Sequence, residues 1–166
     1  MKLLLHCCCA PCSIASVSNL RSDNIEPQLF WYNPNIYPLT EYNSRFDCLK
    51  GFAASEKLKL TSINEGVHEF LDGTERCEKC YVIRLEKTAS FAAQEGFSAF
   101  STTLLISPYQ DHETIKRTGK EMAEKYGIEF FYRDFRPFFR ESQNAARAKG
   151  YYMQKYCGCI YSKEQK

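Results

Sequence analysis

The chain opens with the stretch Leu3-Leu4-Leu5-His6-Cys7-Cys8-Cys9-Ala10-Pro11-Cys12-Ser13, which decides the fold. Its short apolar run predicts a buried strand. Pro11 cannot continue a strand ladder and restricts Ala10, so we expect the chain to turn there and a helical pattern to begin at Ser13. In an open α/β sheet the loop after such a strand lies at the carboxyl edge, where ligands bind. Here that loop carries cysteines instead of the glycines of a phosphate-binding loop.

Strand and helix patterns alternate along the rest of the chain. Further strands are expected over residues 27–32, 60–63, 97–102 and 128–132, and further helices over 40–58, 74–95 and 112–126. We expect Thr40 to cap the second helix, and Gly96 and Gly127 to end the next two. The alternation predicts an α/β fold, a parallel sheet with helices on both faces. A length of 166 residues suits one ordinary domain, which we place at 1–166.

The composition is marked by nine cysteines, far above ordinary usage, whereas a net charge of +2 neither demands nor excludes a polyanionic partner. Leu3 to Leu5 is too short for a secretory signal, and no apolar run approaches membrane-spanning length. We therefore expect a cytoplasmic protein without a membrane partner, whose cysteines are kept reduced. An odd cysteine count argues against a closed disulfide framework. Metal ligation, redox catalysis and burial as small hydrophobic residues remain.

Three groups of cysteines are candidates for chemistry. They are Cys7, Cys8, Cys9 and Cys12 in the opening stretch, Cys77 and Cys80 at the start of a predicted helix, and Cys157 and Cys159 near the end. Residues i and i+3 share one helix face, and the first turn of a helix favours thiolate over thiol. Because the loop before Cys77 follows a strand, we expect Cys77 and Cys80 to face the same edge as Cys8 and Cys9. Four thiolates suit a structural zinc ion or a [4Fe–4S] cluster, and a protein without metal is the third alternative.

The remaining cysteines differ in what their positions favour. Cys7 is expected in the core, because adjacent side chains of an extended segment point to opposite faces. Cys48 lies among apolar residues of a predicted helix and is also expected in the core. Cys12 is either a core thiol or a ligand of a second metal or of the substrate. The one-residue gap between Cys157 and Cys159 allows a small, strained and easily reduced disulfide ring, so the pair is interpreted as a redox dithiol or as additional metal ligands. The alternative is two thiols in a turn.

The tail from Arg133 onward interleaves cations with aromatic residues. The cations are Arg133, Arg136, Arg140, Arg147, Lys149 and Lys155, and the aromatic residues are Phe135, Phe138, Phe139, Tyr151, Tyr152 and Tyr156. Cations fit phosphates and exposed aromatic rings stack on unpaired bases, so RNA binding is one of two interpretations of this tail. In the alternative interpretation the rings are core, the charges form a solvated face, and Asp134 pairs with one arginine.

Several segments together resemble the epoxyqueuosine reductases of the QueH type. They are Leu-Leu-His-Cys-Cys-Cys-Ala-Pro-Cys at 4–12, Tyr-Asn-Pro-Asn-Ile-Tyr-Pro at 32–38, Glu-Tyr at 41–42, Cys-Glu-Lys-Cys-Tyr-Val-Ile-Arg-Leu at 77–85, Phe-Ser-Thr-Thr-Leu-Leu-Ile-Ser-Pro-Tyr-Gln at 100–110, Tyr-Arg-Asp-Phe-Arg at 132–136 and Gln-Lys-Tyr-Cys-Gly-Cys-Ile-Tyr-Ser at 154–162. The resemblance implies a fold of the adenine-nucleotide α-hydrolase kind. The Ser-Gly-Gly-x-Asp-Ser loop of nucleotide-hydrolysing members is replaced by residues 6–13, which argues against ATP binding.

The resemblance further implies an activity and a set of site residues. The activity is reduction of epoxyqueuosine to queuosine at the wobble position, which makes a tRNA anticodon loop and an external electron donor the expected partners. The implied [4Fe–4S] cluster has ligands matching Cys8, Cys9, Cys77 and Cys80. An additional adjacent iron is also implied, to which we assign Cys12, and Cys157 and Cys159 match a redox-active disulfide.

Two other functions and three proton donors stay open at this point. The other functions are a zinc-stabilised RNA-binding module and a thiol–disulfide oxidoreductase that uses Cys157 and Cys159. The candidate proton donors are His6, Tyr109 and His112, and His6 has the alternative of being a core histidine whose hydrogen bonds are satisfied.

Overall fold

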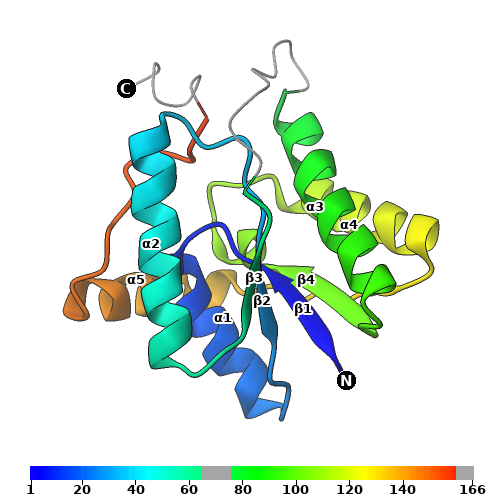
Figure 1. The fold of residues 1–166 in the computed structure, drawn as a ribbon, viewed down its shortest axis with the longest axis horizontal. Coiled ribbons are helices and arrows are strands. Elements are labelled where there is room, and N and C mark those ends of the chain that lie inside the picture. The colour runs from blue at the N-terminus through cyan, green and yellow to red at the C-terminus, as the bar shows by residue number, and fades with distance from the viewer. Residues whose placement is uncertain (65–75, 160–166) are drawn as a thin grey trace.

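A parallel β-sheet forms the centre of the protein (Figure 1), whose computed structural model describes residues 1–64 and 76–159. Within these residues the sheet has five strands, in the order β3-β2-β1-β4-β5. The strands are β1 (Leu3–His6), β2 (Gln28–Trp31), β3 (Leu60–Ser62), β4 (Ala99–Thr102) and β5 (Glu129–Phe130). This order places β1 in the middle, between β2 and β4, at the point where the direction of winding reverses.

Helices cover both faces of the sheet, as Figure 1 shows. They are α1 (Ala10–Ser22), α2 (Leu39–Ser55), α3 (Arg76–Gln94), α4 (His112–Tyr126) and α5 (Phe139–Ala148), with short 3-10 helices η1 (Thr103–Ile106) and η2 (Arg136–Phe138). The helices α1, α2 and α5 lie on one side, and α3 and α4 lie on the other. The α/β fold expected from the sequence, with parallel strands and two helical layers, is confirmed. Across the described ranges, every helix is too short or too polar to span a lipid bilayer.

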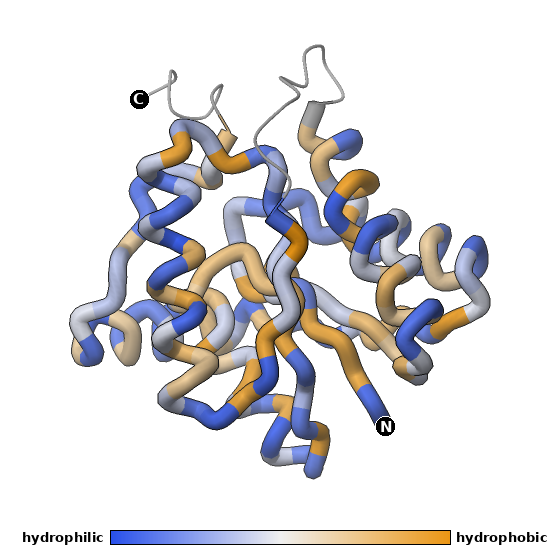
Figure 2. The backbone as a smooth tube through the Cα atoms, in the orientation of Figure 1, coloured by the Kyte–Doolittle hydropathy of each residue, from blue (hydrophilic) through white to orange (hydrophobic). Residues whose placement is uncertain are grey.

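The core is densest around the central strand. All four residues of β1 are buried, and Figure 2 shows the hydrophobic residues concentrated in the central strands while the outer helices are mostly hydrophilic. His6 is the polar member of β1. Its Nε2 lies 3.1 Å from the carbonyl oxygen of Tyr32 and 3.1 Å from Oδ1 of Asn33, while its Nδ1 lies 2.9 Å from the Thr102 hydroxyl. Because two acceptors face Nε2, that atom carries the proton and Nδ1 accepts from Thr102.

Burial lowers the pKa of His6 to about 4, so the ring is neutral at neutral pH. A neutral ring that ties the carboxyl ends of β1, β2 and β4 together fits the core interpretation of His6 and not that of a proton donor.

Two helix starts were predicted wrongly. The first helix begins at Ala10 rather than at Ser13, and Pro11 lies in its first turn instead of in a separate loop. Proline is well accommodated there, because a first-turn N–H has no partner in the helix. The second helix begins at Leu39 after Pro38, which supplies no side-chain cap, so the expected cap at Thr40 is also wrong. The predicted start at Thr74 lies outside the described residues, whereas Gly127 ends α4 in the left-handed conformation as expected.

The helix α5 was not predicted, because its buried face lacks large apolar residues. Ser142 and Ala146 are its buried residues, and they pack on α1. The Ser142 hydroxyl donates to the carbonyl oxygen of Pro11 and accepts from the N–H of Ala15, with O···O and N···O distances of 2.5 and 3.0 Å. A small polar side chain therefore anchors the C-terminal third of the chain to the first helix.

Candidate cysteine site at the carboxyl edge of the sheet

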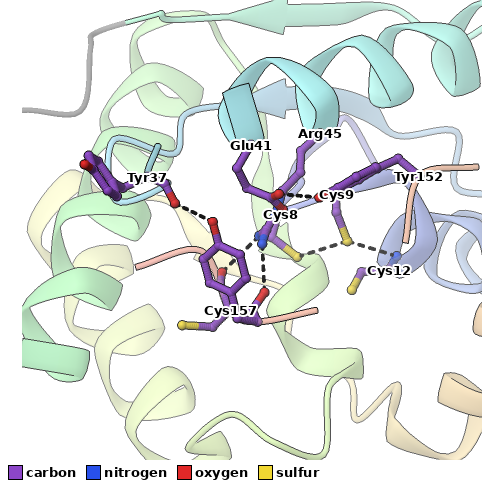
Figure 3. Close-up of polar contacts among 9 residues, drawn as sticks. Cys8, Cys9, Cys12, Tyr37, Glu41, Arg45, Tyr152 and Cys157 are labelled. Carbon is purple, nitrogen blue, oxygen red and sulfur yellow. Dashed lines mark hydrogen bonds and ion pairs between the residues drawn. The ribbon is translucent and has the colours of Figure 1, made fainter. Parts of the chain in front are cut away.

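Three cysteine sulfurs gather where β1 passes into α1. The Sγ atoms of Cys8, Cys9 and Cys12 all lie within 4.8 Å of one another, and all three residues are buried. Figure 3 shows the three side chains grouped at the start of α1. Cys9 is the N-cap of the helix, and its Sγ accepts from the N–H of Cys12 at 3.4 Å. The first turn of α1 thus places Cys12 over Cys9. We refer to Cys8, Cys9 and Cys12 as the thiol trio.

A threonine at the end of β4 holds the first member of the thiol trio. The N–H of Cys8 donates to Oγ1 of Thr103 at 3.1 Å, and the Cys8 sulfur lies 3.3 Å from the same oxygen. Thr103 is fully buried and opens η1 directly after β4. The neighbouring strand ends β1 and β4 therefore fix this sulfur together.

The thiol trio concentrates negative charge on one sulfur. Hydrogen bonds from Cys12 and Cys9 hold the pKa of Cys8 well below its usual range. Burial holds the pKa of Cys9 well above that range, and the hydrogen bonds to Cys8 and Cys9 do the same for the pKa of Cys12. A bound cation favours loss of the thiol protons, because metals bind thiolates.

Two other cysteines lie away from this site. Cys7 points into the core, where its thiol donates to the carbonyl oxygen of Leu5 at 3.4 Å and burial raises its pKa to about 12. Cys48 is half-buried and packs against the core from α2. The predicted core position of Cys7 is confirmed.

A buried arginine, Arg84, interacts electrostatically with cysteines of both α3 and the thiol trio. Cys77 is exposed and Cys80 half-buried on the first turns of α3, and Arg84 follows Cys80 by one helical turn on the same face. Burial raises the pKa of Cys80, while the adjacent Arg84 opposes that rise. Burial alone would lower the pKa of Arg84, but the charges of Cys80, Cys8 and further groups raise it. Arg84 therefore lies within electrostatic reach of both sulfur groups, although the α3 sulfurs are not among those within 4.8 Å of one another.

The last cysteine pair lies on a segment that returns to this edge. The sulfurs of Cys157 and Cys159 are 3.6 Å apart, a hydrogen-bonding rather than a covalent distance. The N–H of Tyr37, in the loop after β2, donates to the carbonyl oxygen of Gly158 at 2.7 Å, which ties this pair to the carboxyl edge where the parallel neighbour β1 also ends.

Arg45, Arg84 and Thr103 are site residues that the sequence did not single out. Arg84 had a usable signal, namely its spacing of four residues from Cys80. Thr103 lies in the family-like segment at 100–110, but nothing there pointed to its partner Cys8, 95 residues away along the chain. Arg45 had no signal, because its partner Cys157 is 112 residues away.

Two of the candidate proton donors lie in quite different surroundings. Tyr109 is 85% exposed. His112 is buried, with its Nε2 lying 3.0 Å from the Leu105 carbonyl oxygen and its Nδ1 3.3 Å from the Tyr132 hydroxyl. This histidine belongs to a hydrogen-bonded network behind η1.

The aromatic residues of the tail divide between core and surface. Phe135 is fully buried, Phe138, Phe139 and Tyr151 pack partly buried against the core, and Tyr152 is exposed. The ion pair of Asp134, part of the alternative interpretation of this tail, is present, since Nη2 of Arg136 lies 2.8 Å from its carboxylate. Hydrogen bonds from Arg136 lower the pKa of Asp134 to about 2. Much of the tail is therefore structural, and Tyr152 keeps the exposure that base stacking needs.

Known proteins match the chain over nearly its whole length. A family model described as "Epoxyqueuosine reductase QueH" matches residues 3–165. The chain belongs to the epoxyqueuosine reductase QueH family. Its relatives named epoxyqueuosine reductase QueH include that of Dehalococcoides mccartyi, 34% identical, with 99% of this chain and 94% of the relative covered. The QueH of Thermotoga maritima is also 34% identical, with 96% and 89% covered. The resemblance seen in the sequence is thus confirmed.

Among solved structures the likeness concerns the fold alone. The deacetylase of the teicoplanin biosynthesis pathway, in its bog complex, superposes with a TM-score of 0.57 at 9% identity, covering 90% of this chain and 83% of the deacetylase. Its teicoplanin complex gives a TM-score of 0.51 at 9% identity, covering 90% and 86%. Both agree with the parallel α/β architecture that places the cysteines of this QueH family member at one edge.

The donor chemistry of the thiol trio fits a thiophilic metal. Two thiolates on one tetrahedral ion, with bonds of about 2.3 Å, lie about 3.8 Å apart. The Cys8 and Cys9 sulfurs are 3.9 Å apart, so the trio matches ligands that share an ion. The cysteines of a [4Fe–4S] cluster each bind a different iron and their sulfurs lie farther apart, so Cys8 and Cys9 would have to separate to hold such a cluster.

Proposed function

We propose that the chain is an epoxyqueuosine reductase, which reduces the epoxide of epoxyqueuosine at the wobble position of a tRNA to give queuosine. One observation carries the proposal. A chain matched by the QueH family over residues 3–165 holds three buried cysteine sulfurs within 4.8 Å of one another at the edge where α/β sheets bind ligands.

The proposed cofactor is a [4Fe–4S] cluster held by Cys8, Cys9, Cys77 and Cys80, with an additional iron at Cys12. Thiolate ligands, a buried trio and the shared electrostatic reach of Cys8 and Cys80 to Arg84 support this set. When bound, the cluster would supply one-electron transfer, and an iron at Cys12 would supply Lewis acidity. Arg84 offsets the negative charge of the surrounding thiolates.

The dithiol of Cys157 and Cys159 is proposed as the two-electron reductant. Removal of the epoxide oxygen as water breaks two C–O bonds and consumes two electrons and two protons. Oxidation of two thiols to one disulfide releases two electrons and two protons, so the step balances. An external electron donor then returns the disulfide to the dithiol. With the sulfurs 3.6 Å apart, closure to a bond of about 2.05 Å needs only a small movement.

The substrate proposal includes the anticodon loop of the tRNA as partner and the cytoplasm as location, where thiols stay reduced. Arg140, Lys149 and Lys155 are exposed cations that can bind phosphates, and Tyr152 is 39% exposed beside them in the tail.

The test uses anaerobically purified protein and a tRNA that carries epoxyqueuosine, with nucleosides measured by mass spectrometry. We expect brown protein with broad absorption near ~400 nm, as for clusters of this class, and conversion of epoxyqueuosine to queuosine. The variant Cys8→Ser is expected to lose both metal and conversion, while Cys48→Ser keeps both. Colourless zinc protein that binds tRNA and leaves the epoxide intact would contradict the proposal and favour an RNA-binding module.

A further inference from the structure

The segment that carries the dithiol is held to the body by its main chain. Arg45 donates from Nη2 to the carbonyl oxygen of Tyr156 at 2.7 Å and from Nη1 to that of Cys157 at 3.0 Å. The N–H of Tyr37 donates to the carbonyl oxygen of Gly158 at 2.7 Å. Three successive carbonyls are therefore bound, two of them by one side chain of α2 (Figure 3).

Arg45 is itself fixed before it reaches the segment. It is 1% exposed, and its Nε donates to the Glu41 carboxylate at 2.7 Å, one helical turn earlier. The hydroxyl of Tyr152 donates to the other oxygen of Glu41, and the Arg45 guanidinium lies 5.3 Å from the centroid of the Tyr156 ring. The planar guanidinium of Arg45 thus donates once to Glu41 and twice to main-chain carbonyls. A lysine cannot reproduce this arrangement of three donors.

A buried ion pair is weak evidence for stability, because desolvation offsets much of its attraction. Stability alone therefore does not explain why Glu41 and Arg45 form a buried ion pair. The geometry offers an explanation, because the paired Arg45 also binds two main-chain carbonyls.

Gly158 makes this close approach possible. Its φ is +120°, a backbone conformation that side chains disfavour, and a Cβ there would lie 3.0 Å from Nη1 of Arg45 and 3.1 Å from Cγ1 of Ile36. Gly158 is buried, whereas Cys157 beside it is exposed. The glycine therefore faces the body, and the three contacts with Arg45 and Tyr37 run through the main chain of the loop.

We infer that Arg45 is a positioning residue that docks the Cys157-Gly158-Cys159 loop against α2 and so holds the dithiol at the cysteine site. The task of the dithiol rests on the proposed function, but the docking is a property of the protein without tRNA. Three bound carbonyls restrict the main chain at both thiols. Tyr37 lies in the loop after β2, which leaves the sheet at the same carboxyl edge as the cysteines after the parallel neighbour β1.

The experiment measures release of the segment in the reduced holoprotein. Trypsin cleaves after Lys155 only when the following residues leave the body, so the native-state cleavage rate reports docking. For Arg45→Gln we expect at least tenfold faster cleavage at Lys155, unchanged absorption of the metal centre, and loss of conversion of tRNA-bound epoxyqueuosine. The cleavage rate of Arg45→Lys is expected to lie between those of Arg45→Gln and the wild type, because lysine keeps the positive charge but lacks the planar guanidinium.

The matched control is Arg21→Gln. Arg21 also donates to a carboxylate and to a main-chain carbonyl, both of Glu56, but it lies away from the cysteines. It is expected to leave cleavage at Lys155 and conversion at wild-type rates. Wild-type cleavage in a folded Arg45→Gln would overturn the inference. If Arg45→Gln does not fold, Gly158→Ala disrupts the same contact from the other side. A wild-type rate of cleavage at Lys155 in Gly158→Ala would also overturn the inference.

The outcomes separate this inference from the proposed function. Faster cleavage in Arg45→Gln together with a wild type that converts no epoxyqueuosine would leave the docking intact and refute the function. Faster cleavage with undiminished conversion would refute the positioning role and leave the function intact.

Discussion

Replacing Thr103 with valine tests how the strand ends hold the thiol trio. The change keeps the shape of the side chain but removes the oxygen that accepts from the Cys8 N–H at 3.1 Å and lies 3.3 Å from the Cys8 sulfur. A buried N–H left without a partner costs about 1–3 kcal/mol. For a chain of this size about 2 kcal/mol corresponds to a fall in Tm of roughly 4–8 °C. Because Thr103 also lowers the pKa of Cys8, Thr103→Val is expected to raise that pKa.

The assay combines thermal unfolding of the reduced, metal-free protein with the pH dependence of alkylation at Cys8, followed by mass spectrometry. The control is Thr88→Val, because Thr88 is also fully buried. Its hydroxyl donates to the carbonyl oxygen of Arg84 within α3, so removing it leaves no N–H without an acceptor. We expect a smaller loss of stability and unchanged alkylation of Cys8 in the control. Equal unfolding temperatures for Thr103→Val and wild type, with the same alkylation profile, would refute the claim that Thr103 fixes Cys8.

Three further predictions concern the metal, the dithiol and pH. Cys77→Ser is expected to lose the iron that Cys48→Ser retains, measured as iron per protein after anaerobic purification; full iron in Cys77→Ser would remove α3 from the ligand set. Cys159→Ser is expected to keep the absorption of the metal centre and lose conversion of epoxyqueuosine, and full conversion would exclude a redox role for the dithiol. Burial depresses the pKa of His6 from 6.5 to about 4, so the unfolded chain binds the extra proton and stability is lost as pH falls from about 6.5 to 4. The free energy of unfolding falls by about 3 kcal/mol over this pH range, so the denaturant midpoints of wild type and His6→Gln should converge as pH falls. Midpoints that change with pH in parallel would show that His6 is not responsible.

The elements that the sequence predicted well are those with a strong local signal. Three consecutive leucines before polar residues marked β1, and the alternation of patterns marked the parallel sheet. Gly127 adopts the left-handed conformation that its place after α4 required. The start of α1 was misjudged because Pro11 fits a first helical turn as well as it fits a loop. The helix α5 escaped notice because Ser142 and Ala146 give no apolar periodicity.

The candidate site divides along the same line. Cysteine type and spacing predicted Cys8 and Cys9 as ligands and left Cys12 open, and the structure places the three sulfurs within 4.8 Å of one another through the cap geometry of Cys9. Arg45 and Thr103 depend on partners about a hundred residues away, and such contacts leave no periodic trace in the sequence. Local chemistry was therefore predictable, whereas the side chains that orient it required the packed structure.

The most direct test of the proposed centre is an anomalous difference map at the iron edge from anaerobically grown crystals. We expect iron density bonded to the sulfurs of Cys8, Cys9, Cys77 and Cys80, with a further peak at Cys12. Density from zinc at the thiol trio, or iron that leaves the sulfurs of α3 without a bond to it, would contradict the proposed centre.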